Sequence, residues 1–180
     1  MPSELFESVK IPKERIGALI GTKGKIKRKL EKLAGVELEV DSETGSIGIQ
    51  GKENAANFYD SVNVVKAIGR GFSPEAAFAL FDENMLFDII KVSDIVGGSE
   101  KAIRTKKARI IGTEGRAREA IENATGAKIS VFGKTIAIIG NYEEVELARK
   151  AVEMLLQGAQ HKKAMDFLRK EKAGMEKFTL

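Results

Sequence analysis

Hydrophobic and polar residues alternate in several short stretches of the chain, which is the pattern of a β-strand with one buried face. The clearest case is Val36 to Val40, in which Val, Leu and Val alternate with two glutamates. The other stretches show either a looser alternation or a more continuous run of apolar residues. Together these stretches predict strands over 5–11, 36–40, 47–50, 85–92, 128–132 and 135–139.

Between the predicted strands, apolar residues recur at helical spacing. Ser73, Ser99 and Asn141 are well placed to cap helix starts, and Gly35 to end a helix. The pattern predicts helices over 12–20, 24–34, 53–68, 75–81, 99–109, 116–124, 141–156 and 159–172. The expected packing positions include Ala56, Tyr59, Val62 and Val65 in the 53–68 helix, and Met165 and Leu168 in the last one.

The order strand, helix, glycine turn, helix, strand, strand, helix occurs twice along the chain. When Ile20–Val40 is aligned with Ile111–Val131, seven of 21 positions are identical. The identical pairs are Ile20/Ile111, Gly21/Gly112, Thr22/Thr113, Gly24/Gly115, Glu31/Glu122, Gly35/Gly126 and Val40/Val131. Internal duplication explains this pattern most simply.

The glycine turns, Gly21–Gly24 and Gly112–Gly115, are a weak signal when taken as bare Gly-x-x-Gly matches. With glycine at 18 of 180 positions, about two such matches are expected by chance, and the chain contains four. Two of the four overlap in the predicted hairpin around Gly48. The other two each follow an aliphatic pair and open a helix with Lys or Arg in its first turn, and such a turn can accept a phosphate group.

Charge is distributed unevenly although the net charge is only +4. Residues 10–34 carry nine Lys or Arg against two acids, and residues 101–120 carry seven against two. Residues 37–60 carry six acids against one lysine. Both basic segments surround a glycine turn, which favours an electrostatic footprint for a polyanion over randomly clustered surface charge.

Several function classes find no support in the chain. It has no cysteine, no run of apolar residues long enough to cross a membrane, no leader-like pattern in residues 1–5 and no P-loop motif. The single histidine, His161, lies beside two lysines and is interpreted as a solvated helix residue. We therefore expect no enzyme activity, no cofactor, no metal site and no membrane association, and we expect a cytoplasmic setting.

The two glycine turns in this helical context resemble those of the KH family of RNA-binding domains, in the eukaryotic-type (type I) order. The resemblance implies an α+β fold with two tandem KH domains, each a three-stranded antiparallel sheet packed against three helices, plus a C-terminal helix. Residues 1–81 would form the first domain with a linker helix, and residues 82–180 the second with a C-terminal helical extension.

In KH domains the glycine loop and its helices form one wall of a groove, a strand forms the other, and about four single-stranded nucleotides lie between them. For the first copy, the resemblance implies RNA contacts by Gly21, Thr22, Lys23 and Gly24, phosphate contacts by Lys25, Lys27 and Arg28, and groove positions for Ile20, Ile26 and Leu38. For the second copy it implies Gly112, Thr113, Glu114 and Gly115, with Arg116 and Arg118 behind the loop, and Ile111 and Ile129 in the groove. Because Glu114 would repel a phosphate, we expect the first copy to bind more strongly through charge.

The stretch Arg70–Ala76, taken with the tandem copies, resembles the archaeal "partner of Nob" and Krr-type small-ribosomal-subunit assembly factors. This narrower resemblance implies small-subunit ribosomal RNA near its 3′ end as the bound polymer, and ribosome-assembly or translation-factor proteins as partners.

Four alternatives remain open at this point. One of the two copies could be structural and serve only to pack against the other. Ile20, Ile26 and Leu38 could be plain core residues rather than groove residues. Both copies could serve a protein-interaction scaffold that has lost RNA binding, for which the acidic segment 37–60 and the C-terminal helix would offer surfaces. Single-stranded DNA could also replace RNA in the grooves.

Overall fold

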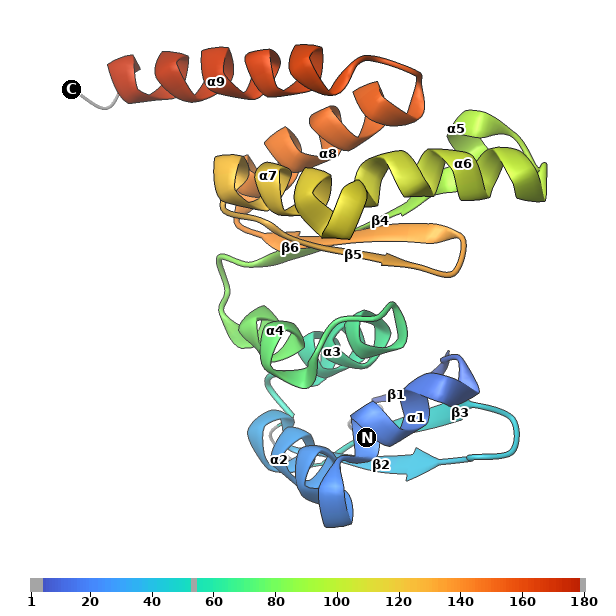
Figure 1. Ribbon diagram of the computed structural model, residues 1–180. Helices are drawn as coiled ribbons and strands as arrows, with labels where there is room; N and C mark the ends of the chain where they lie inside the picture. The colour runs from blue at the N-terminus through green and yellow to red at the C-terminus, as the bar shows by residue number, and fades with distance from the viewer. Residues whose placement is uncertain (1–4, 53–54, 179–180) are drawn as a thin grey trace. The chain divides into compact units, whose positions relative to one another are not determined.

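The computed structural model of the protein describes residues 5–52 and 55–178 (Figure 1). The chain divides into two compact units, residues 1–83 and residues 84–180. The boundary expected between residues 81 and 82 lies two residues before this division. Within the described ranges, no helix is both long and apolar enough to cross a membrane.

The first unit is a three-stranded antiparallel sheet with strand order β1-β3-β2, covered by helices. Its elements are β1 (Phe6–Lys10), α1 (Lys13–Ile20), the 3₁₀ turn η1 (Thr22–Gly24), α2 (Lys25–Ala34), β2 (Val36–Val40), β3 (Ser46–Gly51), α3 (Phe58–Gly69), α4 (Pro74–Phe78) and the 3₁₀ turn η2 (Ala79–Phe81). The alternation predicted for β2 is observed, since Val36 and Leu38 are buried and Glu37 is exposed.

The second unit has the same order with the short helix α5 added after its first strand, and its sheet has the matching strand order β4-β6-β5. Its elements are β4 (Leu86–Lys91), α5 (Val92–Val96), α6 (Glu100–Ile111), the 3₁₀ turn η3 (Thr113–Gly115), α7 (Arg116–Thr125), β5 (Lys128–Phe132), β6 (Thr135–Gly140), α8 (Tyr142–Leu156) and α9 (His161–Phe178). The predicted α+β fold with two three-stranded antiparallel sheets is therefore confirmed.

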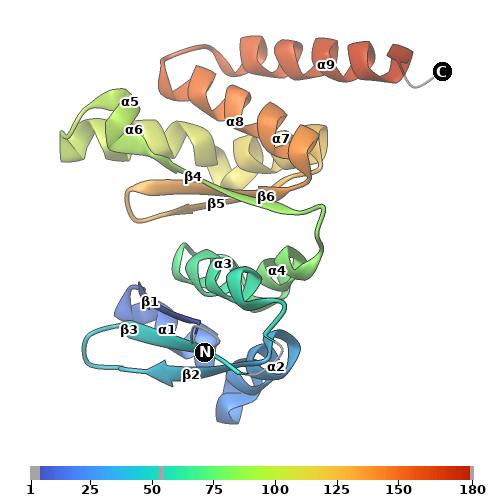
Figure 2. The same ribbon diagram turned by 180° about the vertical axis from the view of Figure 1, so that it is seen from behind.

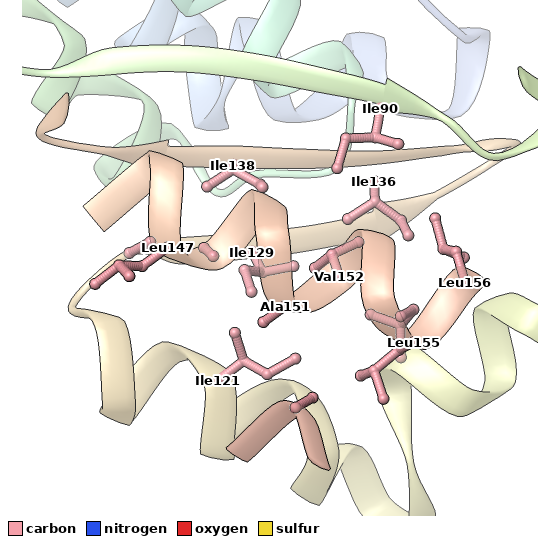
Figure 3. Packing of buried hydrophobic residues seen from close by; sticks show 14 of the residues in the cluster. Ile90, Ile121, Ile129, Ile136, Ile138, Leu147, Ala151, Val152, Leu155 and Leu156 are labelled. Carbon is pink, nitrogen blue, oxygen red and sulfur yellow. The ribbon is translucent and has the colours of Figure 1, made fainter. Parts of the chain in front are cut away.

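The core of the second unit forms where α8 lies against the sheet (Figure 3). Ile136 and Ile138 of β6 meet Ala151 and Val152 of α8, and Ile121 of α7 closes the cluster from the other side. The C-terminal helix α9 packs beyond α8, as both views show (Figures 1 and 2), and contributes the buried Leu168. The helix after the second glycine loop is thus held to the sheet through a shared apolar core.

Capping side chains lie at the helix starts that the sequence predicts. Asn141 and Glu144 form a capping box, in which the Glu144 N–H donates to the Asn141 side chain at 3.0 Å and the Asn141 N–H donates to the Glu144 carboxylate at 2.8 Å. The Ser73 hydroxyl accepts from the Ala76 N–H at 3.2 Å, with proline in the first turn.

The helix predicted from residue 53 differs from the observed one. It begins at Phe58, so Ala56 lies outside it, and residues 53 and 54 lie outside the described residues. The expected packing position Tyr59 is 70% exposed, whereas Phe58 is 2% exposed. The later start leaves fewer turns, and the apolar face is set by Phe58, Val62 and Val65, three and four residues apart.

Two other expectations are corrected by the structure. The short helix α5 occupies Val92–Val96, where a strand end and a loop are predicted, and it has no side-chain cap that the sequence could reveal. The C-terminal helix starts at His161 rather than residue 159 and continues to Phe178. Of its two expected packing positions, Leu168 is fully buried and Met165 half-buried.

Candidate nucleic-acid interface

The two glycine loops have the same backbone conformation. The φ and ψ angles are 71° and 173° at Gly21 and 72° and 177° at Gly112, the first glycine of each loop. At the last glycine they are 73° and 17° for Gly24 and 75° and 9° for Gly115. The repeat seen in the sequence is therefore a repeat of loop geometry.

The residue before the last glycine of each loop is strained. Lys23 has φ 53° and Glu114 has φ 55°, and they are the only non-glycine residues of positive φ among those that the structure describes. Such a conformation costs free energy for a residue with a side chain, and it often marks a functional loop. Both copies hold the strain at the same loop position.

The first glycine of each loop makes room for the helix that follows. A Cβ on Gly21 would lie 2.9 Å from Cβ of Ile26, and a Cβ on Gly112 would lie 2.6 Å from Cβ of Ala117. These contacts are shorter than side chains tolerate, so glycine is required here by packing as well as by φ.

The last glycine of each loop lies beside an arginine head group. A Cβ on Gly24 would lie 2.9 Å from Nη1 of Arg28, and a Cβ on Gly115 would lie 4.0 Å from Nη2 of Arg118. The bare backbone and a guanidinium are thus presented together, which is a suitable arrangement for a phosphate group.

The predicted cations of the first loop differ in their availability. The side chains of Lys23, Lys25 and Arg28 are exposed. Lys27, by contrast, pairs with Glu31 at 3.0 Å and is half-buried. The positive charge that faces solvent therefore comes from the residues nearest the glycines.

In the second loop, Glu114 pairs with Arg116 at 3.1 Å, and both side chains are about three-quarters exposed. This pair offsets part of the repulsion expected from Glu114. Arg118 Nε is the single buried side-chain nitrogen or oxygen without a hydrogen-bond partner among the residues that the structure describes. Its N–H is therefore a donor that none of the described residues satisfies.

The apolar residues expected in the grooves separate into two kinds. Leu38 is 2% exposed and Ile129 is 3% exposed, so these side chains belong to the core of each unit. Ile20 and Ile26 are half-buried, and Ile111 is 36% exposed. The prediction that the side chains of Leu38 and Ile129 line a groove is therefore not supported by their burial.

A carboxylate links the helix after the glycine loop to a strand in each copy. The Glu31 carboxylate accepts from the Leu38 N–H at 2.9 Å, and the Glu122 carboxylate accepts from the Ile129 N–H at 2.8 Å. Sequence reasoning assigned no role to these glutamates. The available signal was their identity at matching positions of the repeat.

Within residues 5–52 and 55–178, no group of three or more His, Asp or Glu side chains is placed to hold a metal ion. The lone histidine, His161, has one ring nitrogen 2.8 Å from the Arg109 carbonyl oxygen, so it serves a structural contact at the end of α6.

Comparison with known families agrees with this geometry. A KH domain is matched at residues 6–58, and a "Eukaryotic type KH-domain (KH-domain type I)" at residues 86–173. A KH domain-containing protein of Methanocaldococcus jannaschii is 44% identical over 170 residues, which cover 93% of this chain and 74% of the relative. The chain therefore belongs to the KH-domain family, with two type I domains in tandem.

Its relatives within that family include proteins named as pre-rRNA-processing factors. "Pre-rRNA-processing protein PNO1" of Chaetomium thermophilum is 35% identical over 109 residues, which are 58% of this chain and 41% of that protein. The structure of Dim2p from Pyrococcus horikoshii matches with TM-score 0.86 and 41% identity, over 92% of this chain and 99% of that chain. A second structure, of an a/eIF2alpha-aDim2p-rRNA complex from the same organism, matches with TM-score 0.90 and 40% identity, over 96% and 97%.

Proposed function

We propose that the protein binds single-stranded RNA through the two glycine-loop grooves and acts in the processing of small-subunit ribosomal RNA. The observation that carries the proposal is the pair of glycine loops with matching backbone angles, each opening a helix with Lys or Arg in its first turn on a KH fold. The glycines and the adjacent Arg28 and Arg118 would receive the sugar-phosphate backbone. The bases would then lie against the strand edge.

Ribosomal RNA near the 3′ end of the small-subunit RNA is the proposed ligand. It is supported by the relative crystallised with rRNA and by the relatives named as pre-rRNA-processing proteins. The proposed setting is the cytoplasm, and the proposed role is that of a binding factor rather than an enzyme.

The proposed contacts are those predicted from the sequence, with two refinements. Leu38 and Ile129 would contribute through backbone atoms, because their side chains are buried. Lys27 would contribute less than Lys23, Lys25 and Arg28, because it is already paired with Glu31.

Charge differs between the two grooves on both walls. The first loop has the exposed Lys23 where the second has Glu114, but the adjoining strand has the exposed Glu37 where the second has the exposed Lys128. The first groove would thus hold RNA mainly from the loop side. The second would hold it more evenly from both sides.

Fluorescence anisotropy with labelled single-stranded RNA of the small-subunit 3′ end tests the proposal. Changing both loops (Thr22→Asp with Lys23→Asp, and Thr113→Asp with Glu114→Asp) should abolish binding, and binding of the native protein should weaken with salt. A control with Gln160→Asp and Lys163→Asp has the charge change of the first-loop variant at exposed positions far along the chain. Binding that survives both loop changes would exclude the grooves, and matched DNA oligonucleotides test the choice of polymer.

A protein partner is a second proposed ligand. The complex that contains the related aDim2p also contains a/eIF2alpha, and this specific observation favours a translation-factor partner here. Calorimetric titration with the α subunit of archaeal initiation factor 2, with the double-loop variant and with native protein, separates the two activities. A scaffold without RNA function would bind the factor and show no RNA affinity.

A further inference from the structure

Glu31 and Glu122 make the same hydrogen bond in the two copies. Each lies in the helix after a glycine loop and accepts from a strand N–H, that of Leu38 at 2.9 Å and that of Ile129 at 2.8 Å. Donor and acceptor occupy matching positions of the repeat on both sides. The same bond thus occurs in both copies, although two-thirds of the residues aligned between 20–40 and 111–131 differ.

These bonds lie on the side of the strand that would face RNA. In the order β1-β3-β2, strand β2 pairs only with β3, and in β4-β6-β5, strand β5 pairs only with β6. The Leu38 N–H points away from β3, since it donates to the carboxylate, and its carbonyl points to the same side because the two groups of one strand residue share a direction. The carboxylate therefore bridges helix and strand along the free edge.

We propose that Glu31 and Glu122 are positioning residues that fix the width of each RNA groove. The carboxylate ties the helix that opens at the glycine loop to the strand that forms the opposite wall, so the two walls cannot separate. Glu31 is largely shielded, with its side chain 19% exposed, so water competes weakly for the strand N–H. This role rests on the proposed function of the grooves.

Charge and positioning predict opposite results for the same substitution. Glu31→Ala removes a negative charge and releases Lys27 from its ion pair, and both changes should strengthen the attraction to phosphate. If the carboxylate fixes the groove, the same substitution should weaken RNA binding instead. Glu31→Gln removes the charge but keeps an oxygen that can accept from the Leu38 N–H.

The experiment measures anisotropy with labelled small-subunit 3′-end RNA, in a background where Thr113→Asp and Glu114→Asp silence the second groove. We expect Glu31→Ala to bind roughly three- to tenfold more weakly, as a lost shielded hydrogen bond predicts. Glu31→Gln should bind at least as tightly as the background. Glu7→Ala is the matched control, because Glu7 is an exposed acid on β1, at the opposite edge of the same sheet, and it should not weaken binding.

Unchanged or tighter binding by Glu31→Ala would overturn the proposal. Thermal unfolding of each variant identifies a loss of fold, and if Glu31→Ala unfolds, Glu122→Ala repeats the test in the other copy, with the first groove silenced by Thr22→Asp and Lys23→Asp. A native protein that binds no RNA would instead refute the proposed function itself, so the two failures are distinguishable.

Discussion

Arg15 and Arg109 form the same two-carbonyl clamp in the two units. Arg15 donates to the carbonyls of Ile68 at 2.8 Å and Phe72 at 2.7 Å. Arg109 donates to the carbonyls of Leu155 at 2.9 Å and Ala159 at 2.6 Å. In each unit the guanidinium of the helix before the glycine loop thus binds one carbonyl in the last turn of the long helix α3 or α8 and one carbonyl just beyond it.

The clamp is out of register with the sequence repeat. In the alignment of Ile20 with Ile111, Arg15 corresponds to Lys106, and Arg109 lies about one helical turn further along. In each unit the guanidinium nevertheless donates to two carbonyls that are four residues apart in the sequence. The clamp is therefore a shared feature of the fold of each unit, although the two arginines do not occupy matching positions of the sequence repeat.

Replacing Arg109 by alanine should destabilise the second unit. Two half-buried carbonyls would lose a charged donor, which costs roughly 2–3 kcal/mol of unfolding free energy. Arg109→Lys should not restore the lost stability, because an ammonium cannot reproduce the forked geometry of a guanidinium. Urea unfolding gives the difference, with the exposed Arg104→Ala as control. Equal stability of Arg104→Ala and Arg109→Ala would contradict this.

Alanine at Gly21 should damage the first loop. Positive φ and the close approach to Ile26 predict a loss of roughly 1–3 kcal/mol of stability together with weaker RNA binding. Gly17→Ala is the matched control within α1, because nothing lies within 4 Å of its Cβ position. A helical alanine there should stabilise the protein by about 0.5–1 kcal/mol. Chemical unfolding and anisotropy measure the two variants side by side.

Exchanging the loop charges tests how each groove holds RNA. Lys23→Glu should weaken binding and Glu114→Lys should strengthen it, each by roughly two- to fivefold at low salt, because the side chains are exposed and screened. Both effects should fade as salt is raised. An effect of Glu114→Lys that persists in high salt would mean that the substitution changes the loop rather than its charge.

Asp41 should make the β2–β3 turn sensitive to acid. The Thr44 hydroxyl donates to its carboxylate at 2.6 Å, the Thr44 and Glu43 N–H groups also donate, and the pKa of Asp41 is lowered from 3.8. Folding thus favours the charged carboxylate, so its stabilisation is present above pH 3.8 and is lost as pH falls through the lower folded pKa.

Asp41→Asn should therefore be less stable than native protein near neutrality, and the difference should shrink in strong acid. Denaturant unfolding across this range measures it, and Glu43→Gln serves as the control on the same turn. A stability difference that stays constant below pH 3.8 would show that the effect is not due to protonation of Asp41.

Much of the fold follows from local pattern. The alternation in 36–40 and the capping residues Ser73 and Asn141 place the elements within a few residues of where they lie. These signals are local, because a strand with one buried face and a capped helix end are each encoded by neighbouring residues. The loop glycines are local as well, since their φ and their packing involve the next few positions.

Features that depend on contacts between residues far apart in the sequence could not be predicted from it. Neither Arg15 nor Arg109 could be assigned, because their partners lie more than forty residues away and break the repeat register. The burial of Leu38, which the groove hypothesis leaves open, depends on how the helices cover the sheet. RNA contact by the predicted residues stays a prediction.

The strained conformation at Lys23 and Glu114 restricts how the duplicated loops can diverge. With φ near 55°, β-branched residues and proline are disfavoured there, and glycine, asparagine and unbranched polar residues are tolerated. The one position at which the two loops differ in charge is thus open to few amino acids. Evolution of the two copies toward different RNA segments would then proceed by switching the sign of a single side chain on an unchanged backbone.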